Sequence, residues 1–114
     1  MVMDDDIVRF LVSTDNHLGY AEKDPVRCQD SFAAFEEVLR TAKENKVDFI
    51  LLAGDMFHEN KPSRRTMHNT MELLRMYCFS EDPIYLEVLN EQSEIFKVLY
   101  HYCAFIRYYT LFMA

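Results

Sequence analysis

The sequence predicts an α/β fold in which parallel strands carry helices on their faces. Stretches of apolar, β-branched residues, typical of strands, alternate with stretches in which apolar residues recur every three or four positions, typical of helices. The expected order is strand, helix, strand, helix, strand, which favours right-handed crossovers and a parallel sheet. With 114 residues, half of them hydrophobic, the chain forms at most one domain with a buried core.

The first half of the chain contains two strong strands and the helix between them. Residues 7–14 (IVRFLVST) predict a strand that is buried over most of its length. After a loop, apolar residues three and four apart predict a helix from about residue 30 to residue 46, which Asp30 or Ser31 can cap. Residues 47–55 (VDFILLAGD) predict a second buried strand.

The second half predicts two further elements and a distinct tail. Pro62 and Ser63 open a helix that runs to about Cys78, and residues 84–89 (IYLEVL) predict a third strand. Residues 98–114 contain six aromatic residues and one basic residue, without a turn residue. This composition is poor for a lipid core, so we favour an unconstrained tail over a membrane anchor.

Composition limits the classes of function. The net charge of −7 argues against a general attraction to nucleic acid or to anionic membrane, so that any nucleic-acid contact must be local. Three cysteines without CxxC spacing indicate neither a disulfide framework nor a zinc ribbon, which fits a reducing, intracellular compartment. The acidic start, MVMDDD, differs from a secretory signal, and we expect the chain to be unprocessed.

Acidic and imidazole side chains follow both strands where they end. Asp15 and His17 follow the first strand, and Asp55 follows the second. In a parallel sheet such positions meet at one edge, where ligands bind. Two carboxylates with an imidazole suit Mn²⁺, Fe²⁺ or Zn²⁺ better than Ca²⁺, and water beside such an ion becomes a nucleophile near neutral pH. Each residue alone is also consistent with a turn or a helix cap, and Gly54 with either a close backbone approach or a simple turn.

Two groups of motifs resemble a known family. DNH (15–17) and GDMFHENKPSR (54–64) resemble the first two motifs of calcineurin-like metallophosphoesterases. EKDPVR (22–27) and FHENKPSR (57–64) are similar to the eukaryotic double-strand-break repair nuclease of the meiotic-recombination-eleven family. The resemblance spans about residues 7–93. It implies the N-terminal part of a metallophosphoesterase α/β sandwich, truncated relative to the family, with the nuclease part at 1–97 and the divergent tail at 98–114.

The resemblance also implies a site with two manganese ions. Asp15 and His17 would ligate one Mn²⁺, and Asp55 would bridge both ions. His58 would help to position the scissile phosphate, although by itself it is more typical of a surface imidazole. The GNHD and GHxH segments that complete the family's site do not occur in this sequence. We therefore expect weak ion binding and little or no cleavage by this chain alone.

Three basic residues near this site could contact DNA phosphates, or could simply form the solvated first turn of a helix. Their position at a helix N-terminus opposes the helix dipole, and this misfit favours the functional interpretation. They are Lys61, Arg64 and Arg65.

The second predicted helix carries a wide apolar arc. Met67, Met71, Leu74 and Cys78 form one stripe, and Thr66, Thr70, Leu73 and Tyr77 form another beside it. The resemblance implies that this helix joins two subunits, so that Thr70, Leu73 and Tyr77 would form a dimer surface. The alternative is a helix buried on two sides within its own domain.

Together these observations predict a manganese-dependent nuclease subunit of double-strand-break repair, weak or inactive alone. The resemblance implies DNA, a second copy of the chain, an SMC-like repair ATPase and a nibrin-type subunit as partners, a nuclear location and no membrane. One alternative is a catalytically silent dimerisation module from a truncated isoform. Another is a different metallophosphoesterase that acts on small phosphates.

Overall fold

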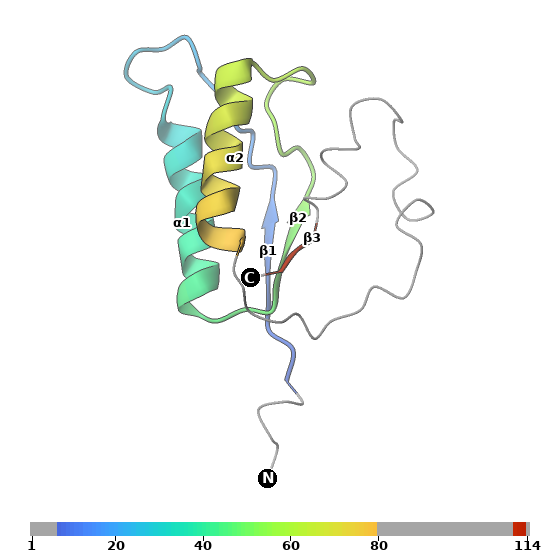
Figure 1. Cartoon of the computed structure of the whole chain (residues 1–114). Coiled ribbons are helices and arrows are strands. Elements are labelled where there is room, and N and C mark those ends of the chain that lie inside the picture. The colour runs from blue at the N-terminus through green and yellow to red at the C-terminus, as the bar shows by residue number, and fades with distance from the viewer. Residues whose placement is uncertain (1–6, 80–110, 114) are drawn as a thin grey trace.

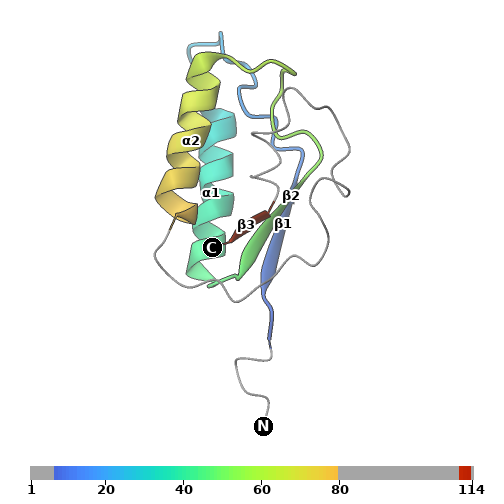
Figure 2. The ribbon, with the colours of Figure 1, turned by 45° about the vertical axis from the view of Figure 1, so that its right-hand side comes forward.

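The structure, a computed structural model, describes residues 7–79 and 111–113. Both helices lie side by side against one face of a small sheet, as Figures 1 and 2 show from two directions. Within the described part of the chain, neither helix is long and apolar enough to cross a membrane. The elements are β1 (Phe10–Thr14), α1 (Asp30–Glu44), β2 (Phe49–Ala53), α2 (Arg64–Cys78) and β3 (Leu111–Met113).

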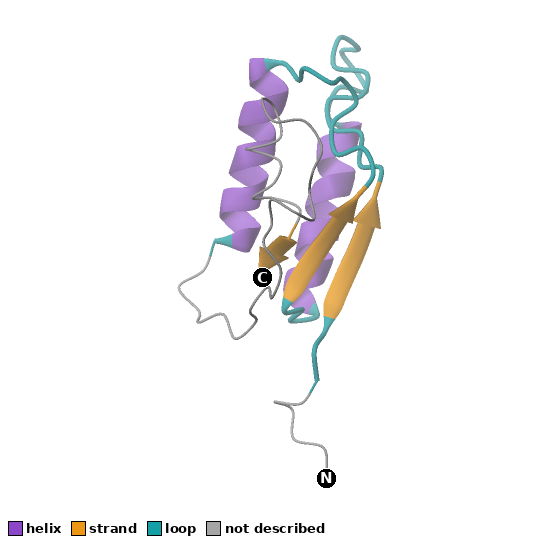
Figure 3. Ribbon diagram, turned by 90° about the vertical axis from the view of Figure 1, so that its right-hand side faces the viewer, coloured by secondary structure: helices purple, strands orange, loops and turns teal. Residues whose placement is uncertain are grey.

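The sheet has the order β1-β2-β3. β1 and β2 are parallel, with Phe10 opposite Phe49, and Figure 3 shows their arrowheads at the same end. This strand–helix–strand unit confirms the predicted α/β fold. The third described strand, β3, instead pairs with β2 in the antiparallel sense, which needs no crossover connection. The strand predicted at 84–89 and most of the tail at 98–114 lie outside the described residues, and the division at residue 97 stays a prediction.

The hydrophobic core lies between the two helices and one face of the sheet. Ile50 of β2 and Leu74 of α2 are fully buried in it, and the amphipathic pattern of α1 is confirmed. Each large side chain buried in this way contributes about 2 kcal/mol to stability. The core residues are Leu18, Phe32, Phe35, Leu39, Ala42, Val47, Ile50, Leu52, Met56 and Leu74.

The opposite face of the sheet is exposed in the described structure. Phe10 and Val12 of β1 are 57% and 51% exposed, and Phe10 stacks on the half-buried Phe49 with 5.3 Å between ring centroids. The prediction that residues 7–14 are buried over most of their length is therefore wrong. Because both helices lie on the same face, alternate residues of β1 point away from them.

Both helices begin and end close to the predicted residues, but the N-terminal cap of the first helix differs from the predicted one. α1 begins after Gln29, whose side chain makes no capping bond, so the predicted cap by Asp30 or Ser31 is wrong. The Ser31 hydroxyl instead accepts a hydrogen bond from the Gly19 N–H at 3.2 Å and ties the loop to the helix. α2 begins after Ser63, whose hydroxyl accepts from the Thr66 N–H at 3.0 Å. These contacts anchor the loop segments that lead into the candidate site.

Two neighbouring strand positions test which face of the sheet is covered. We expect Ile50→Ala to lower the free energy of unfolding by about 2–5 kcal/mol, because it leaves a cavity in the core. Val12→Ala should cost about 1 kcal/mol or less, because this side chain is half exposed. Urea unfolding followed by circular dichroism measures both. Equal losses would contradict the exposed face.

Candidate metal centre

Backbone pairing between the β1 and β2 segments continues beyond the last residues of both strands. The residues after β1 remain hydrogen-bonded to the residues after β2, through Leu18 and beyond, although their conformation is no longer that of a strand. The side chains that follow the two strands are consequently held next to one another. The bonds run from Asp15 N to Ala53 O (3.1 Å), His17 N to Asp55 O (3.1 Å), Leu18 N to Met56 O (2.8 Å) and His58 N to Leu18 O (3.0 Å).

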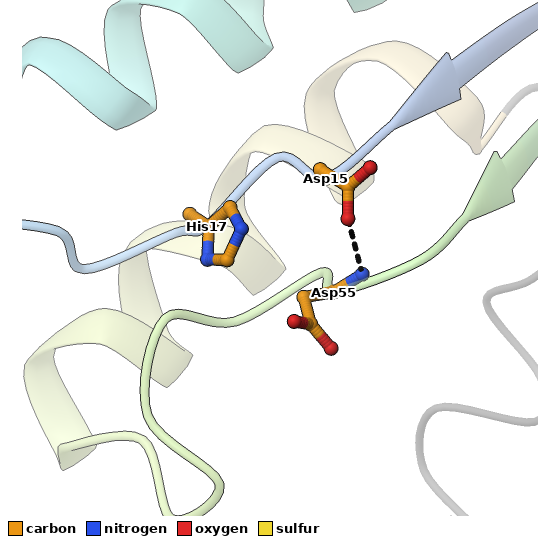
Figure 4. A group of neighbouring side chains, drawn as sticks. All are labelled: Asp15, His17 and Asp55. Carbon is orange, nitrogen blue, oxygen red and sulfur yellow. Dashed lines mark hydrogen bonds between the residues drawn. The ribbon is translucent and has the colours of Figure 1, made fainter.

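Three potential metal ligands lie together at this end of the sheet. Asp15, His17 and Asp55 each offer one ligand atom, and these atoms all lie within 4.8 Å of one another. Figure 4 shows Asp15 and His17 on the segment after β1, and Asp55 on the segment after β2. The two carboxylates are exposed and the imidazole is half-buried. The structure thus brings together the three residues that the sequence placed at the strand ends.

The backbone at these residues has an unusual conformation. Asp15 has φ of 52° and His17 has φ of 46°, both in the left-handed region that L residues rarely adopt. Each such residue costs roughly 1–3 kcal/mol, and conformations of this kind concentrate at functional sites. The local strain is offset by the continued pairing with the segment after β2.

Gly54 lets the Asp15 carboxylate approach the second segment. It has φ of 67°, and a Cβ added there would lie 2.5 Å from Asp15 Oδ1. A positive φ and a close approach to Asp15 are therefore both present at this glycine. The approach allows the Asp55 N–H to donate a hydrogen bond to Asp15 Oδ1 at 3.3 Å, the dashed line in Figure 4.

The donor set fits a divalent cation. His17 Nδ1 is buried and has no hydrogen-bond partner, which is costly for a polar atom unless a ligand or water satisfies it. Two carboxylates and an imidazole are the ligands of a borderline transition-metal ion. Among the residues that the structure describes, one group of at least three His, Cys, Asp or Glu side chains has ligand atoms close enough to share an ion, and it is this group.

His58 lies beside this group, as expected from the sequence. It is exposed, and its ring centroid is 5.6 Å from that of His17 with the planes 63° apart. The His58 ring also makes a T-shaped contact with the Tyr20 ring, with 5.1 Å between the ring centroids. His58 is thus placed to contact a ligand bound at the three clustered side chains.

The three basic residues are exposed near the start of α2. Lys61 lies in the loop before the helix, and Arg64 and Arg65 form its first turn, which has no acidic residue. Arg65 lines a hollow between α1 and α2 together with Asn69 and Leu73. A role of these residues in phosphate contact stays a prediction.

The predicted dimer surface on α2 needs a correction at Thr70. This side chain is 1% exposed, and its hydroxyl donates to the Thr66 carbonyl oxygen at 2.8 Å, so its polar atom is satisfied inside the chain. Thr70 therefore cannot contact a partner. Leu73 and Tyr77 are partly buried against the core. The Tyr77 hydroxyl donates to Glu36 at 2.8 Å, and this bond raises the pKa of Tyr77 above its ordinary value.

Sequence reasoning missed the residue that ties the loop after β1 to α2. The Glu22 carboxylate accepts hydrogen bonds from the hydroxyls of Ser63 and Thr66, more than forty residues away in sequence. Gly19, with φ of 85°, passes so close to Thr66 that an added Cβ would lie 2.7 Å from its hydroxyl oxygen. The EKDPVR motif contains Glu22, and it is the signal that could have indicated this residue.

The two glycines provide a matched test of the centre. Gly54→Ala should weaken cation binding about tenfold or more, because its Cβ displaces the Asp15 carboxylate. Gly19→Ala has the same backbone strain, but its Cβ meets Thr66 instead, so we expect lost stability with near-normal cation affinity. Calorimetric titration with Mn²⁺ and thermal unfolding measure the two effects. The same loss of affinity in both variants would refute the specific role of Gly54.

Comparison with known proteins identifies the family of this chain. Residues 8–88 match the family model of the calcineurin-like phosphoesterases. The double-strand break repair protein MRE11 of Mus musculus is 58% identical over 90 residues, which are 79% of this chain and 13% of that protein. The human protein of the same name is 56% identical over 90 residues, with the same coverage. The one from Oryza sativa subsp. japonica is 56% identical over 86 residues, which are 75% of this chain and 12% of that protein.

The chain therefore spans a small part of the length of the curated relatives that it matches. The match nevertheless includes the segments after β1 and β2, which contain the three clustered candidate ligands. From the family model and the identities with these relatives, we conclude that the chain belongs to the calcineurin-like phosphoesterase family, within which it is similar to the double-strand break repair protein MRE11.

Proposed function

We propose that this chain contributes one half of a two-metal site to a manganese-dependent nuclease of double-strand-break repair. The observation that carries the proposal is the grouping of Asp15, His17 and Asp55 within 4.8 Å at the ends of two parallel strands. The names of the relatives support the repair context, since each of those cited is a double-strand break repair protein. The reaction would be hydrolysis of a phosphodiester bond.

Each side chain has a separate role in this proposal. Asp15 and His17 would hold one ion, for which His17 offers its unpaired Nδ1. Asp55, on the segment after β2, would supply a further carboxylate, the one that the resemblance gives to both ions. Bound divalent cations would supply an activated water and neutralise charge on the phosphate. His58, exposed beside the group, orients the phosphate by a hydrogen bond from its ring.

The site is proposed to bind ions weakly and to cleave poorly in this chain alone. Three protein ligands are few for two ions, and the sequence has no GNHD or GHxH segment to supply more. A poorly fixed second ion would not hold the attacking and leaving oxygens in line, which two-metal hydrolysis requires. The proposal therefore concerns mainly metal binding, and catalysis by this chain alone is expected to be weak or absent.

DNA contact is proposed to be local and electrostatic. The whole chain carries a net charge of −7, which repels a phosphate backbone, so attraction must come from a limited patch. Lys61, Arg64 and Arg65 supply three positive charges around the N-terminus of α2. Such contacts do not depend on base sequence and weaken as salt concentration rises.

Assembly with a second copy is proposed to use α2. Leu73 lines the hollow between α1 and α2, and Tyr77 is only partly buried beside it. An SMC-like repair ATPase, a nibrin-type subunit and a nuclear location belong to the same proposal, and they rest on the resemblance to the repair nucleases. The hollow on the helices also favours the second candidate function, a dimerisation module without catalysis.

The metal assignment is tested by Asp55→Asn. This change should abolish most Mn²⁺ binding in calorimetry, because it removes the charge of the carboxylate that faces both proposed ions. Asp48→Asn is the matched control, since Asp48 precedes β2 at the opposite end and accepts a hydrogen bond from the Arg9 N–H at 2.7 Å. Equal binding by wild type and Asp55→Asn would refute the assignment.

The same preparations distinguish the candidate functions. We expect no Mn²⁺-dependent cleavage of linear or single-stranded DNA above background. Robust cleavage that is lost in His17→Ala would show that the three ligands suffice. Hydrolysis of a chromogenic phosphate monoester without DNA cleavage would instead favour a phosphatase of small substrates. Absence of both activities and of Mn²⁺ binding would favour the dimerisation module.

The proposed dimer surface is tested by two adjacent leucines. Leu73→Asp should weaken self-association and leave the fold intact, because Leu73 is only partly buried and lines the hollow. Leu74→Asp should unfold the domain, since its side chain is fully buried in the core. Sedimentation and circular dichroism measure the two outcomes. If both variants unfold alike, α2 is wholly internal and presents no dimer surface.

A further inference from the structure

The His58 ring is held by contacts with two other rings. His58 is exposed on the loop between β2 and α2, where a histidine ring would ordinarily sample several rotamers. Its backbone N–H is bonded to the Leu18 carbonyl at 3.0 Å, which fixes the loop but not the ring. The ring itself contacts the rings of both His17 and Tyr20. The second contact is nearly perpendicular, with 89° between the planes of the two rings.

Tyr20 is in turn fixed in place by its own neighbours. Its backbone N–H donates to the His17 carbonyl at 3.0 Å, so Tyr20 is tied directly to a candidate metal ligand. The Arg27 guanidinium lies over the Tyr20 ring at 5.5 Å from its centroid. A cation placed over an aromatic face is attracted by the ring, and this contact restricts the orientation of Tyr20.

Arg27 is held by one acidic residue of the same loop and by another at the start of α1. Its Nε donates to Asp30 Oδ2 at 3.2 Å, at the start of α1. The Asp24 carboxylate accepts from the backbone N–H groups of Val26 and Arg27 and fixes the turn between them. A continuous series of contacts therefore leads from the start of α1 through Arg27 and Tyr20 to His58.

We propose that Tyr20 is a positioning residue that holds the His58 ring beside the candidate metal centre, and that the contact with Arg27 fixes Tyr20 in turn. The inference rests on the proposed function for the role of His58. Tyr20 is 43% exposed and is not a core residue, so its contribution is to orient a neighbour. The aromatic ring, not the hydroxyl, makes both contacts.

The requirement for a ring suggests a matched pair of variants. Tyr20→Phe keeps the T-shaped contact with His58 and the cation contact with Arg27, whereas Tyr20→Leu keeps an apolar side chain but loses both. Because Tyr20 is partly exposed, both variants should remain folded, and circular dichroism checks this. A merely structural role would affect His17 as much as His58, whereas the positioning role predicts a loss at His58 alone, in Tyr20→Leu and not in Tyr20→Phe.

Paramagnetic broadening by Mn²⁺ reports the position of each histidine ring. Full-length chain with labelled histidines is titrated with Mn²⁺ alone, and the broadening of ring protons is followed by NMR. In wild type and Tyr20→Phe we expect strong broadening of both His17 and His58. In Tyr20→Leu, broadening of His17 should persist while that of His58 falls at least twofold. His68, exposed on α2 beside Glu72, is the internal control and should not respond to the variants.

Failure of the inference can be separated from failure of the proposed function. If His58 broadens equally in wild type and Tyr20→Leu, Tyr20 does not position it. If His17 fails to broaden in wild type, the metal assignment is wrong. The positioning role is then decided without metal, by the nuclear Overhauser contacts between the Tyr20 and His58 rings. Their presence in wild type and Tyr20→Phe supports the role, and their absence in wild type overturns it.

Discussion

The candidate centre depends on the parallel pairing of β1 with β2 and on its continuation beyond both strands. The two segments stay hydrogen-bonded through Leu18, so the residues that follow each strand cannot separate. This pairing brings Asp15 and Asp55, forty residues apart in sequence, into direct hydrogen-bond contact. The unfavourable backbone at Asp15 and His17, and the glycine at 54, make sense only because this pairing holds the two segments together.

Much of the centre could be predicted from sequence because it follows from topology. Parallel strands end at the same edge of a sheet, so polar residues after two such strands must meet there. The positions of Asp15, His17 and Asp55 were therefore predictable before any coordinate was known, and the family motifs added His58. The starts of α1 and α2 followed equally from the spacing of apolar residues and from Ser63. These are local signals, which a single sequence contains.

Other features could not be predicted because they depend on which elements pack together. An apolar strand such as residues 10–14 looks the same whether one face or both faces are covered, and here its alternate residues are exposed. Thr70 is polar in sequence but buried in the structure, and its burial is tolerated because its hydroxyl donates to a carbonyl oxygen within the helix. The contacts of Glu22 with Ser63 and of Tyr20 with His58 join loops that no periodic pattern relates.

The short sequence span of the three ligands has a consequence for synthesis of the protein. All of them lie between residues 15 and 55, in one strand–helix–strand unit. Translation proceeds from the N-terminus at about 5–20 residues per second, so this unit leaves the ribosome seconds before the segments that follow it. The residues of the candidate metal centre thus emerge before α2, together with the apolar side chains of β1, which are open to aggregation at that stage.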